Sequence, residues 1–341
     1  MKAQILEGIS PAENRPLKLI DLPIPQPKAK EILVKVSACG VCHTELDEIE
    51  GRLKPRLPVI LGHEIVGKVE GLGSRATKFN IGDRVGVAWI NSACGKCGFC
   101  KEGNENLCSE FEGTGCQVNG GYAEYTVVSE DFAYLIPDRF TDSQAAPLLC
   151  AGAIGYRALN LTRVEDGQIL GLFGFGASAH LVIQTAKYIY PNCKVFVFTR
   201  PGQKEHQELA KKLGADWTGA TGDTPPEKLN GAIDFTPAWK PIVEALRVLE
   251  KGGRIVINAI RKEERDKDSL LGLNYPTHLW QEKEIKSVAN ITRKDAQDFL
   301  SLAAEIPIVP EVQEFRLEEA NEALVLLKQG KVQGAAVLRM D

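Results

Sequence analysis

Two cysteines and one histidine in apolar surroundings are the residues best suited to chemistry in this sequence. His63 is followed by Glu64 within residues 58–67, between apolar runs typical of strands. Cys42 lies upstream in Gly-Val-Cys-His-Thr-Glu, and Cys150 lies far downstream in Pro-Leu-Leu-Cys-Ala-Gly. Two thiolates and one imidazole are a ligand set of catalytic zinc ions, which keep one coordination position open. The sequence therefore predicts a catalytic zinc site at these three residues.

A second group of cysteines has the spacing of a structural metal site. Its C-x2-C-x2-C-x7-C pattern comprises Cys94, Cys97, Cys100 and Cys108. Four thiolates close a tetrahedral shell, so the zinc predicted here has no open position. A zinc ribbon that binds nucleic acid is the competing interpretation, but such modules have basic surroundings. The surrounding residues here include Glu102, Glu105, Glu110 and Glu112. We therefore expect a structural zinc lobe over residues 91–110 and two zinc ions per chain.

Length and composition limit the class of protein. The chain has 341 residues, enough for two domains, and its 44% apolar and 25% charged residues are typical of globular proteins. A net charge of −4 argues against nucleic acid or an anionic membrane as the main partner. No signal-like N-terminus and no apolar run of about 20 residues is present, so we expect a cytoplasmic protein without membrane association. In that compartment nine cysteines predict metal ligands and thiols.

The elements that position these residues follow two patterns. Short β-branched runs separated by Gly and Pro, at 31–37, 65–70 and 83–87, predict a barrel-like β domain. From about residue 154 strands and helices alternate, which predicts a doubly wound parallel sheet. The expected strands of this sheet are 168–173, 194–198, 232–235, 253–258 and 285–289, and the expected helices are 179–190, 204–213 and 241–249. Helices near 294–305 and 318–329 and a strand at 335–338 are expected to return to the first domain.

A glycine-rich turn follows the first strand of this alternating region. Gly174-x-Gly176-x-x-Ala179 has the G-x-G-x-x-A form of a dinucleotide-binding turn. Gly174 allows the tight turn, Gly176 lets the backbone approach a pyrophosphate, and Ala179 keeps strand and helix close. Ala177 belongs to the same turn, whose helix N-terminus offers unpaired N–H groups. A purely structural glycine turn is the alternative.

The end of the next strand bears on which dinucleotide binds. An NAD site usually has an acidic residue there, which accepts from the ribose 2′-hydroxyl. This sequence instead has Thr199 and Arg200. The guanidinium of Arg200 and the hydroxyl of Thr199 are suited to a 2′-phosphate, so NADP is favoured over NAD. The alternative is that Arg200 is a solvated surface arginine.

Taken together, these motifs resemble a known family. Gly62-His63-Glu64-x2-Gly67-x5-Gly73 resembles the zinc alcohol dehydrogenase signature of the medium-chain dehydrogenase/reductase superfamily. The four-cysteine lobe, the Cys-Ala-Gly segment and the glycine turn follow in that family's order, so the resemblance covers essentially the whole chain. It implies an α/β protein with a GroES-like β-barrel catalytic domain at 1–153 and 292–341. It also implies an inserted Rossmann domain at 154–291, an active-site cleft between the two, and a homodimer or homotetramer built through the Rossmann domains.

The resemblance also implies roles for residues around the predicted catalytic zinc. Cys42, His63 and Cys150 resemble the family's zinc ligands, and Glu64 resembles the glutamate beside the metal. Glu45 matches an acidic position that hydrogen-bonds the ligand histidine and fixes its tautomer.

Further positions match residues that contact substrate or cofactor. Thr44 matches the hydroxyl that accepts the alcohol proton, and His43 the basic residue near the cofactor pyrophosphate. Trp89 and Leu53 match walls of the substrate pocket, although Trp89 suits an ordinary core position as well.

Three positions depart from the family pattern. Asp47 stands where many members have a histidine that passes the proton to solvent, so the relay runs through Asp47, or through the ribose and water, or is less efficient. Ile154 replaces a threonine that often touches the nicotinamide. Ala335 lies near a position where many members have a pyrophosphate-binding arginine, which leaves more of the cofactor affinity to His43 and the glycine turn.

The function expected from these observations is reversible oxidation of a primary or secondary alcohol to an aldehyde or ketone with NAD(P). Zinc would lower the pKa of the alcohol as a Lewis acid. Two alternatives remain open at this point. One is a quinone or enoyl reductase of the same superfamily without catalytic zinc, and the other is a sensor that binds dinucleotide without turnover.

Overall fold

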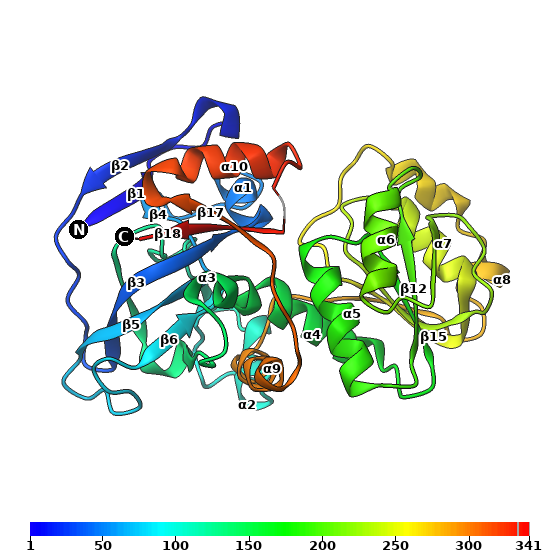
Figure 1. The fold of residues 1–341 in the computed structure, drawn as a ribbon, viewed down its shortest axis with the longest axis horizontal. Coiled ribbons are helices and arrows are strands. Elements are labelled where there is room, and N and C mark those ends of the chain that lie inside the picture. The colour runs from blue at the N-terminus through cyan, green and yellow to red at the C-terminus, as the bar shows by residue number, and fades with distance from the viewer. Residues whose placement is uncertain (333, 341) are drawn as a thin grey trace. The chain divides into compact units, whose positions relative to one another are not determined.

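The computed structural model describes residues 1–332 and 334–340. Its contacts divide the chain into two compact units (Figure 1). The first comprises Met1–Ala153 with Asn290–Asp341, and the second comprises Ile154–Ala289. The sequence analysis placed the second boundary between residues 291 and 292. Each unit has its own sheet structure and is described separately.

The first unit is built around one long strand, β3 (Glu31–Val41). Its side chains at Ile32, Val34 and Val36 are buried and alternate with more exposed ones, the pattern of an antiparallel strand with one face on a core. β3 pairs antiparallel with β5 (Ile65–Leu72), β9 (Tyr125–Ser129) and β18 (Ala335–Arg339). The sheet order β10-β6-β5-β3-β18-β17 adds β6 (Arg84–Val87), β10 (Ala133–Leu135) and β17 (Val312–Arg316).

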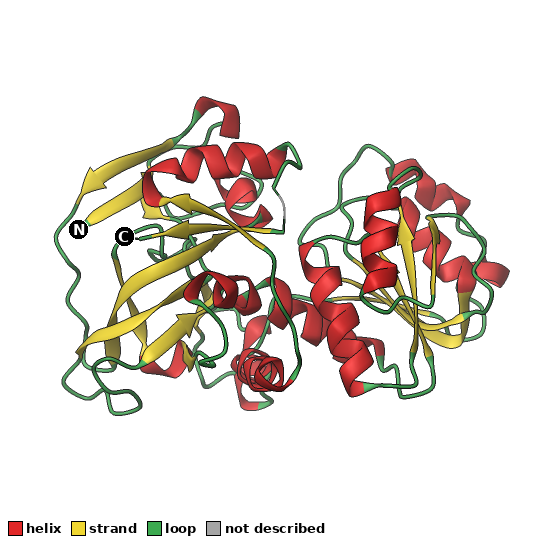
Figure 2. Cartoon of the chain, in the orientation of Figure 1, coloured by secondary structure: helices red, strands yellow, loops and turns green. Residues whose placement is uncertain are grey.

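Smaller elements complete this unit (Figure 2). A second sheet joins β1 (Lys2–Leu6), β2 (Leu17–Asp21) and β4 (Val59–Ile60). The four-cysteine lobe lies between the paired strands β7 (Ile90–Ser92) and β8 (Glu112–Gly113). The helices are α1 (His43–Ile49), α2 (Gly98–Lys101), α3 (Asp142–Ala145), α9 (Arg293–Glu305) and α10 (Ala320–Lys328), with 3-10 turns η1 (Ala12–Asn14), η2 (Glu105–Leu107), η3 (Glu130–Phe132), η4 (Ala146–Leu149) and η6 (Leu317–Glu319).

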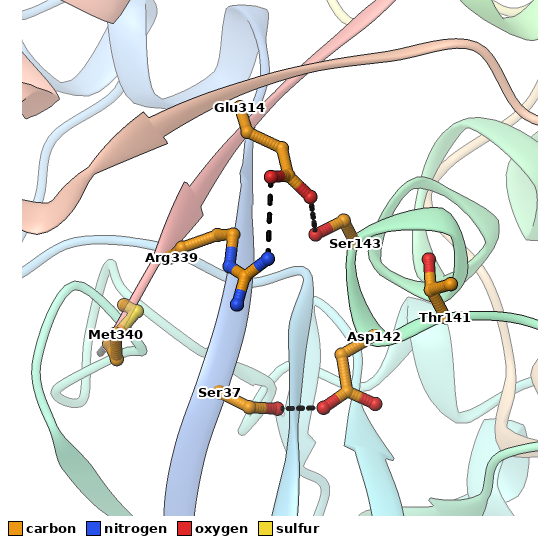
Figure 3. A pocket seen from close by; sticks show the side chains of 7 residues that line it. All are labelled: Ser37, Thr141, Asp142, Ser143, Glu314, Arg339 and Met340. Atoms are coloured by element: carbon orange, nitrogen blue, oxygen red, sulfur yellow. Dashed lines mark hydrogen bonds and ion pairs between the residues drawn. The ribbon is translucent and has the colours of Figure 1, made fainter.

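Polar side chains hold the returning C-terminal strands to the rest of the first unit. They line a hollow of about 290 Å³ between β3, α3, β17 and β18 (Figure 3). The Ser37 hydroxyl donates to Asp142 at 2.5 Å, and the Ser143 hydroxyl lies 2.5 Å from the Glu314 carboxylate. Arg339 donates to the other oxygen of Glu314 at 3.4 Å. These polar groups are hydrogen-bonded to one another, so their role is to hold the strands and α3 together.

The second unit contains one parallel sheet in the order β13-β12-β11-β14-β15-β16. The strands are β11 (Ile169–Phe173), β12 (Lys194–Thr199), β13 (Trp217–Ala220), β14 (Leu229–Asp234), β15 (Leu249–Ile257) and β16 (Glu284–Ser287). The helices are α5 (Ala177–Ile189), α6 (Lys204–Lys212), α7 (Lys240–Val248) and α8 (Tyr275–His278), with η5 (Lys267–Gly272); α4 (Ala151–Thr162) begins in the first unit and ends in the second.

Both faces of this sheet are covered, as its continuous apolar strands require. Every residue of β11 is buried. Leu170 and Leu172 belong to a core cluster with residues of α5, whereas Ile169 and Phe173 belong to a cluster with residues of α7. Burying each such side chain is worth about 1.5–3 kcal/mol. The predictions of a β-rich domain and a doubly wound parallel sheet are therefore confirmed.

Element ends differ from the predictions by a few residues. α5 begins at Ala177 and not at residue 179, because Gly176 is its N-cap and the glycine turn runs directly into the helix. β3 continues to Val41 and so reaches the predicted ligand Cys42. Within residues 1–332 and 334–340, no helix has both the length and the apolar character that crossing a membrane requires.

Candidate active site

Four potential metal ligands converge in the first unit. The ligand atoms of Cys42, His63, Glu64 and Cys150 all lie within 4.8 Å of one another. Cys42 is the N-cap of α1, His63 and Glu64 lie between β4 and β5, and Cys150 follows η4. The fold thus brings together three segments that are far apart in the sequence. His63 and Glu64 are 1% and 3% exposed, so a bound ion would be sheltered from water on their side.

The N-terminus of α1 orients Cys42. The Thr44 N–H donates to the Cys42 sulfur at 3.3 Å, and the Cys42 N–H donates to Glu45 at 2.9 Å. This reciprocal capping fixes the direction of the thiol. A hydrogen bond with Cys150 and burial raise the pKa of the Cys42 thiol well above its ordinary value. Two neighbouring thiols with raised pKa values become thiolates here only with a cation to compensate their charge, which suits a metal site.

Glu45 fixes the tautomer of His63. The Glu45 carboxylate is fully buried and lies 2.5 Å from His63 Nδ1. His63 Nε2 faces the Cys42 sulfur at 3.7 Å. With Nδ1–H donating to Glu45, Nε2 presents its lone pair to the cluster, the arrangement that metal-bound histidines adopt. The Trp89 ring packs edge-on against His63, with 5.0 Å between centroids and 87° between planes.

Glycine makes room for Glu64. A Cβ atom on Gly40 would lie 1.9 Å from the Glu64 carboxylate, so any larger residue on β3 at this point displaces that side chain. Gly62 has φ +95°, and a Cβ there would lie 2.4 Å from the Tyr122 ring. Burial raises the pKa of Glu64 to about 7. The roles of Gly40 and Tyr122 were not predicted, because the Cys-Gly-Val-Cys sequence gives no local signal of a contact with residue 64.

The other residues predicted near the metal differ in how far they are exposed to solvent. Thr44 lies in the first turn of α1 and is 7% exposed, whereas His43 beside it is exposed. Asp47 is 2% exposed and forms an ion pair with Arg52. Leu53 is half-buried, and its N–H donates to the Asp47 carbonyl at 2.9 Å.

The four cysteines of the lobe also converge. The sulfur atoms of Cys94, Cys97, Cys100 and Cys108 all lie within 4.8 Å of one another. Backbone N–H groups of Cys94 and Glu110 donate to the Cys108 sulfur at 3.4 and 3.3 Å. Hydrogen bonds from the Lys96 and Cys97 backbones lower the pKa of Cys94 to about 7. Such donors stabilise thiolates, so the lobe fits a closed four-thiolate metal site.

One glutamate near this lobe has a structural partner. Glu105 is 4% exposed, and its carboxylate accepts from both the backbone N–H and the side chain of Arg293 at 3.0 Å. It therefore fastens the lobe to the start of α9.

The glycine turn in the second unit has the geometry that its sequence predicts. Gly174 has φ +85°, and its N–H donates to the Phe198 carbonyl at 2.8 Å. A Cβ atom on Gly176 would meet nothing within 4 Å, so the backbone is open to a ligand there. Ala177 begins α5, and Ala179 is fully buried in the core between helix and sheet. The turn can therefore present helix N-terminal N–H groups to a pyrophosphate.

The two residues predicted to contact the cofactor's ribose differ in exposure. Arg200 is exposed at the end of β12. Thr199 is 1% exposed, and its hydroxyl donates to the Arg200 carbonyl at 3.2 Å and accepts from Gln207 at 2.9 Å. Because the donor of Thr199 is already used, Arg200 is the better placed of the two to contact a phosphate.

Comparisons with known proteins agree with this arrangement. A model of the alcohol dehydrogenase GroES-like domain matches residues 28–138. The protein named "Probable alcohol dehydrogenase AdhA" from Mycobacterium tuberculosis is 42% identical over 344 residues, covering 99% of this chain and 97% of that protein. An alcohol dehydrogenase from Geobacillus stearothermophilus is 35% identical over 353 residues, 100% of both chains. The solved structure of the alcohol dehydrogenase from Aeropyrum pernix is 26% identical, with a TM-score of 0.86 over 100% of both chains.

The similarity extends over both units and is not confined to one motif. The matched domain model spans Cys42, His63 and the four-cysteine lobe, and the full-length relatives add the glycine turn and the returning C-terminal strands. The predicted GroES-like and Rossmann architecture is thereby confirmed. With such identity along its entire length, the chain belongs to the alcohol dehydrogenase family of the zinc-type medium-chain dehydrogenases/reductases.

Proposed function

We propose that Cys42, His63 and Cys150, with Glu64 beside them, hold the catalytic zinc ion of this alcohol dehydrogenase. The family's reaction is reversible hydride transfer between an alcohol and NAD(P), and this is the reaction of the chain. The observation that carries the metal assignment is the approach of four ligand atoms to within 4.8 Å of one another from three separate segments. Two sulfur atoms and one imidazole nitrogen are a donor set that suits zinc.

The chain's own residues orient the ligands and move a proton. Zinc bound at this site would supply a Lewis acid that lowers the pKa of the alcohol, and NAD(P) would supply the hydride acceptor. Glu45 holds His63 with Nε2 directed at the cluster. Thr44 lies two residues from Cys42, and we assign its hydroxyl as the first acceptor of the alcohol proton. Trp89, packed on His63, and Leu53 are proposed as pocket walls.

The proton route onward from Thr44 is assigned to Asp47. The two residues are three apart on α1 and so are neighbours on its surface. Arg52 donates to Asp47 and also to Glu50, which is more exposed. The ion pair with Arg52 holds the Asp47 carboxylate in place on α1. Asp47 with Arg52 thus takes the place of the histidine that many family members have at this position.

The metal assignment is tested by counting zinc. We expect two zinc ions per chain in the wild-type protein, one at the cysteine lobe. His63→Ala should reduce the count to one and abolish alcohol turnover while NADH or NADPH still binds. Cys97→Ser is the matched variant, because it removes a proposed ligand of the lobe ion and leaves the ligands of the catalytic ion in place. Turnover at the wild-type rate by folded His63→Ala would sink the assignment and revive a zinc-free quinone or enoyl reductase.

We propose NADP as the preferred cofactor. The support is the exposed guanidinium of Arg200 at the end of β12, where NAD sites usually have an acid. Arg200→Ala should raise KM for NADPH about tenfold or more, since charge-assisted hydrogen bonds contribute about 1.5–3 kcal/mol, with little effect on KM for NADH. Lys211→Ala, which removes a positive charge near the end of α6, is the control. A wild-type preference for NADH would end the proposal.

An edge of the second unit suits self-association. All residues of the edge strand β16 are exposed. Ile285 of β16 is exposed, and so is Trp280 just before the strand, whose ring centroid lies 5.7 Å from that of the exposed Tyr275. Exposed apolar side chains beside an unpaired strand edge form a surface that can pack against a second copy of the chain. We therefore propose a homodimer through β16, or a homotetramer that contains it.

The state of the cysteines supports a reducing compartment. All nine cysteines are free of disulfide bonds in the structure. Cysteines as close together as those of the lobe would be prone to disulfide formation in an oxidising compartment. We therefore propose the cytoplasm, and a disulfide detected in the protein from its own cells would contradict this.

A further inference from the structure

A buried ion pair lies at the carboxyl end of β14. Asp234 is fully buried, and the Lys262 side chain is 9% exposed. The Lys262 ammonium donates to Asp234 and to the carbonyls of Thr236 and Ala238, at 2.8 and 2.9 Å for the carbonyls. The other Asp234 oxygen accepts the N–H and the hydroxyl of Thr236 at 3.0 and 2.8 Å. The three ammonium donors are thus used inside this network, so Lys262 acts through the turn that it holds.

The network fastens two loops together. Residues 258–266 follow β15, and residues 235–240 follow β14. Besides Lys262, the Glu263 N–H donates to a carbonyl of the facing loop at 2.8 Å. Asp266 accepts two backbone N–H groups at the start of α7, each at 2.9 Å. A buried ion pair is weak evidence for added stability, because desolvation of both charges offsets their attraction. The stronger effect of this ion pair is that it fixes the position of the turn after β14, whose carbonyl and N–H groups it binds.

The turn that this network holds lies where the strand order of the sheet reverses. The order runs β13-β12-β11 on one side and β14-β15-β16 on the other, so connections diverge between β11 and β14. Dinucleotides bind outside the carboxyl ends of the strands at such a point. Phe173 at the end of β11 is paired in register with Asp234. A Cβ atom on Gly174 would lie 2.8 Å from the Thr236 methyl group. Thr236, held by Asp234, is therefore packed against the glycine turn.

We propose that Lys262 and Asp234 are positioning residues of the dinucleotide site. They hold the turn 235–238 against the glycine turn, so that the floor of the crevice is formed before the cofactor arrives. A preformed site binds more tightly because the cofactor does not have to order it. This inference rests on the proposed function, since it takes the reversal point to be the site of NAD(P).

The test is direct cofactor binding by Lys262→Met, measured by fluorescence titration with NADPH and NADH. Methionine keeps the apolar stem and removes the charge. We expect the Kd to rise about tenfold, because the cofactor must then order the turn that Lys262 holds in the wild type. The KM for the cofactor should rise more than kcat falls, while zinc per chain stays unchanged. The Thr236 N–H should also exchange with solvent faster in the cofactor-free variant.

Two further variants keep the test decisive. Lys262→Met alone leaves Asp234 buried without its cation, so Asp234→Asn/Lys262→Met removes both charges and keeps an acceptor for Thr236. Lys267→Met removes an exposed pair with Glu264 in the same segment and should bind cofactor like the wild type. If the folded double variant has the wild-type Kd and only a lower Tm, the pair is merely structural and the inference fails. If the wild-type protein binds neither dinucleotide, the cofactor site itself is absent and both proposals fail.

Discussion

At the scale of residues, the proposed zinc site depends on side chains that hold its ligands in place. Glu45 is the clearest, because it contacts His63 through one carboxylate oxygen and the Cys42 N–H through the other. One fully buried side chain thus orients two of the proposed ligands. The carboxylate also balances the charge of a bound cation, which is why such partners raise metal affinity.

Glu45→Ala should weaken zinc at the catalytic cluster by about 10–100-fold, the usual effect of losing such a partner. Dialysis against graded chelator, followed by zinc analysis, should show one ion leaving earlier than in the wild type and the lobe ion leaving at the same concentration. Glu110→Ala, an exposed glutamate near the lobe, is the control. Equal chelator sensitivity of Glu45→Ala and wild type would remove this role from Glu45.

Asp47 provides a second prediction at this scale. If the proton leaves through its carboxylate, Asp47→Asn should lower kcat about tenfold, less than the hundredfold or more of a direct acid–base group. Stopped-flow turnover across pH would measure it. Glu50→Gln changes another partner of Arg52 and should leave kcat near the wild-type value. An unaltered rate and pH profile in Asp47→Asn would place the proton route elsewhere.

At the scale of elements, α1 is tied to the C-terminal helix α10. Lys328 on α10 donates to Glu50 at 2.6 Å and to Glu13 at 2.8 Å. Burial disfavours the charged form of Glu50, but hydrogen bonds from Lys328, the Ala12 N–H and Arg52 outweigh it and lower the pKa of Glu50 to about 2. The helix that carries Thr44 and Asp47 is thereby fixed at its far end.

This lowered pKa predicts a pH-dependent difference in stability. The carboxyl of Glu50 titrates near 4.3 in the unfolded chain and near 2 in the folded one. Its stabilising effect is therefore complete above about pH 5 and is lost as the pH falls toward 2. Denaturant unfolding of wild type and Glu50→Gln should differ by a constant free energy near neutral pH. That difference should shrink in acid, and a difference that grows in acid would contradict the assignment.

At the scale of the whole molecule, the exposed edge of the second unit leads to a prediction about assembly. Ile285 is 46% exposed on β16 and Trp280 is 56% exposed just before it. Ile285 is the apolar residue of β16 between Glu284 and Lys286, and Ile285→Lys replaces it with a further charge, which opposes strand pairing and apolar contact. Light scattering after size exclusion should show a smaller assembly than for the wild type. Ile81→Lys, an equally exposed apolar position in the first unit, should leave the mass unchanged. A wild-type mass for Ile285→Lys would move the interface elsewhere.

The sequence by itself determined those features of the protein that depend on residues close together in the chain. Cysteine spacing predicted that four cysteines of the lobe converge, and within a single loop their sulfur atoms do lie close together. The G-x-G-x-x-A pattern identified a turn whose geometry depends on glycine at positive φ. Alternating apolar strands and helices predicted the parallel sheet, since strands that are buried on both faces are apolar along their whole length.

The tertiary structure alone decided which distant side chains meet. Cys150 was predicted as a ligand from its residue type and apolar surroundings, but only the packing of η4 near β3 brings it to Cys42. The pairing of Asp47 with Arg52 and the inward direction of Thr199 were not predicted. Nor was the contact between Asp234 and Lys262, which joins two loops. The physical reason is that propensity and periodicity act over a few residues, whereas such contacts depend on where separate elements pack.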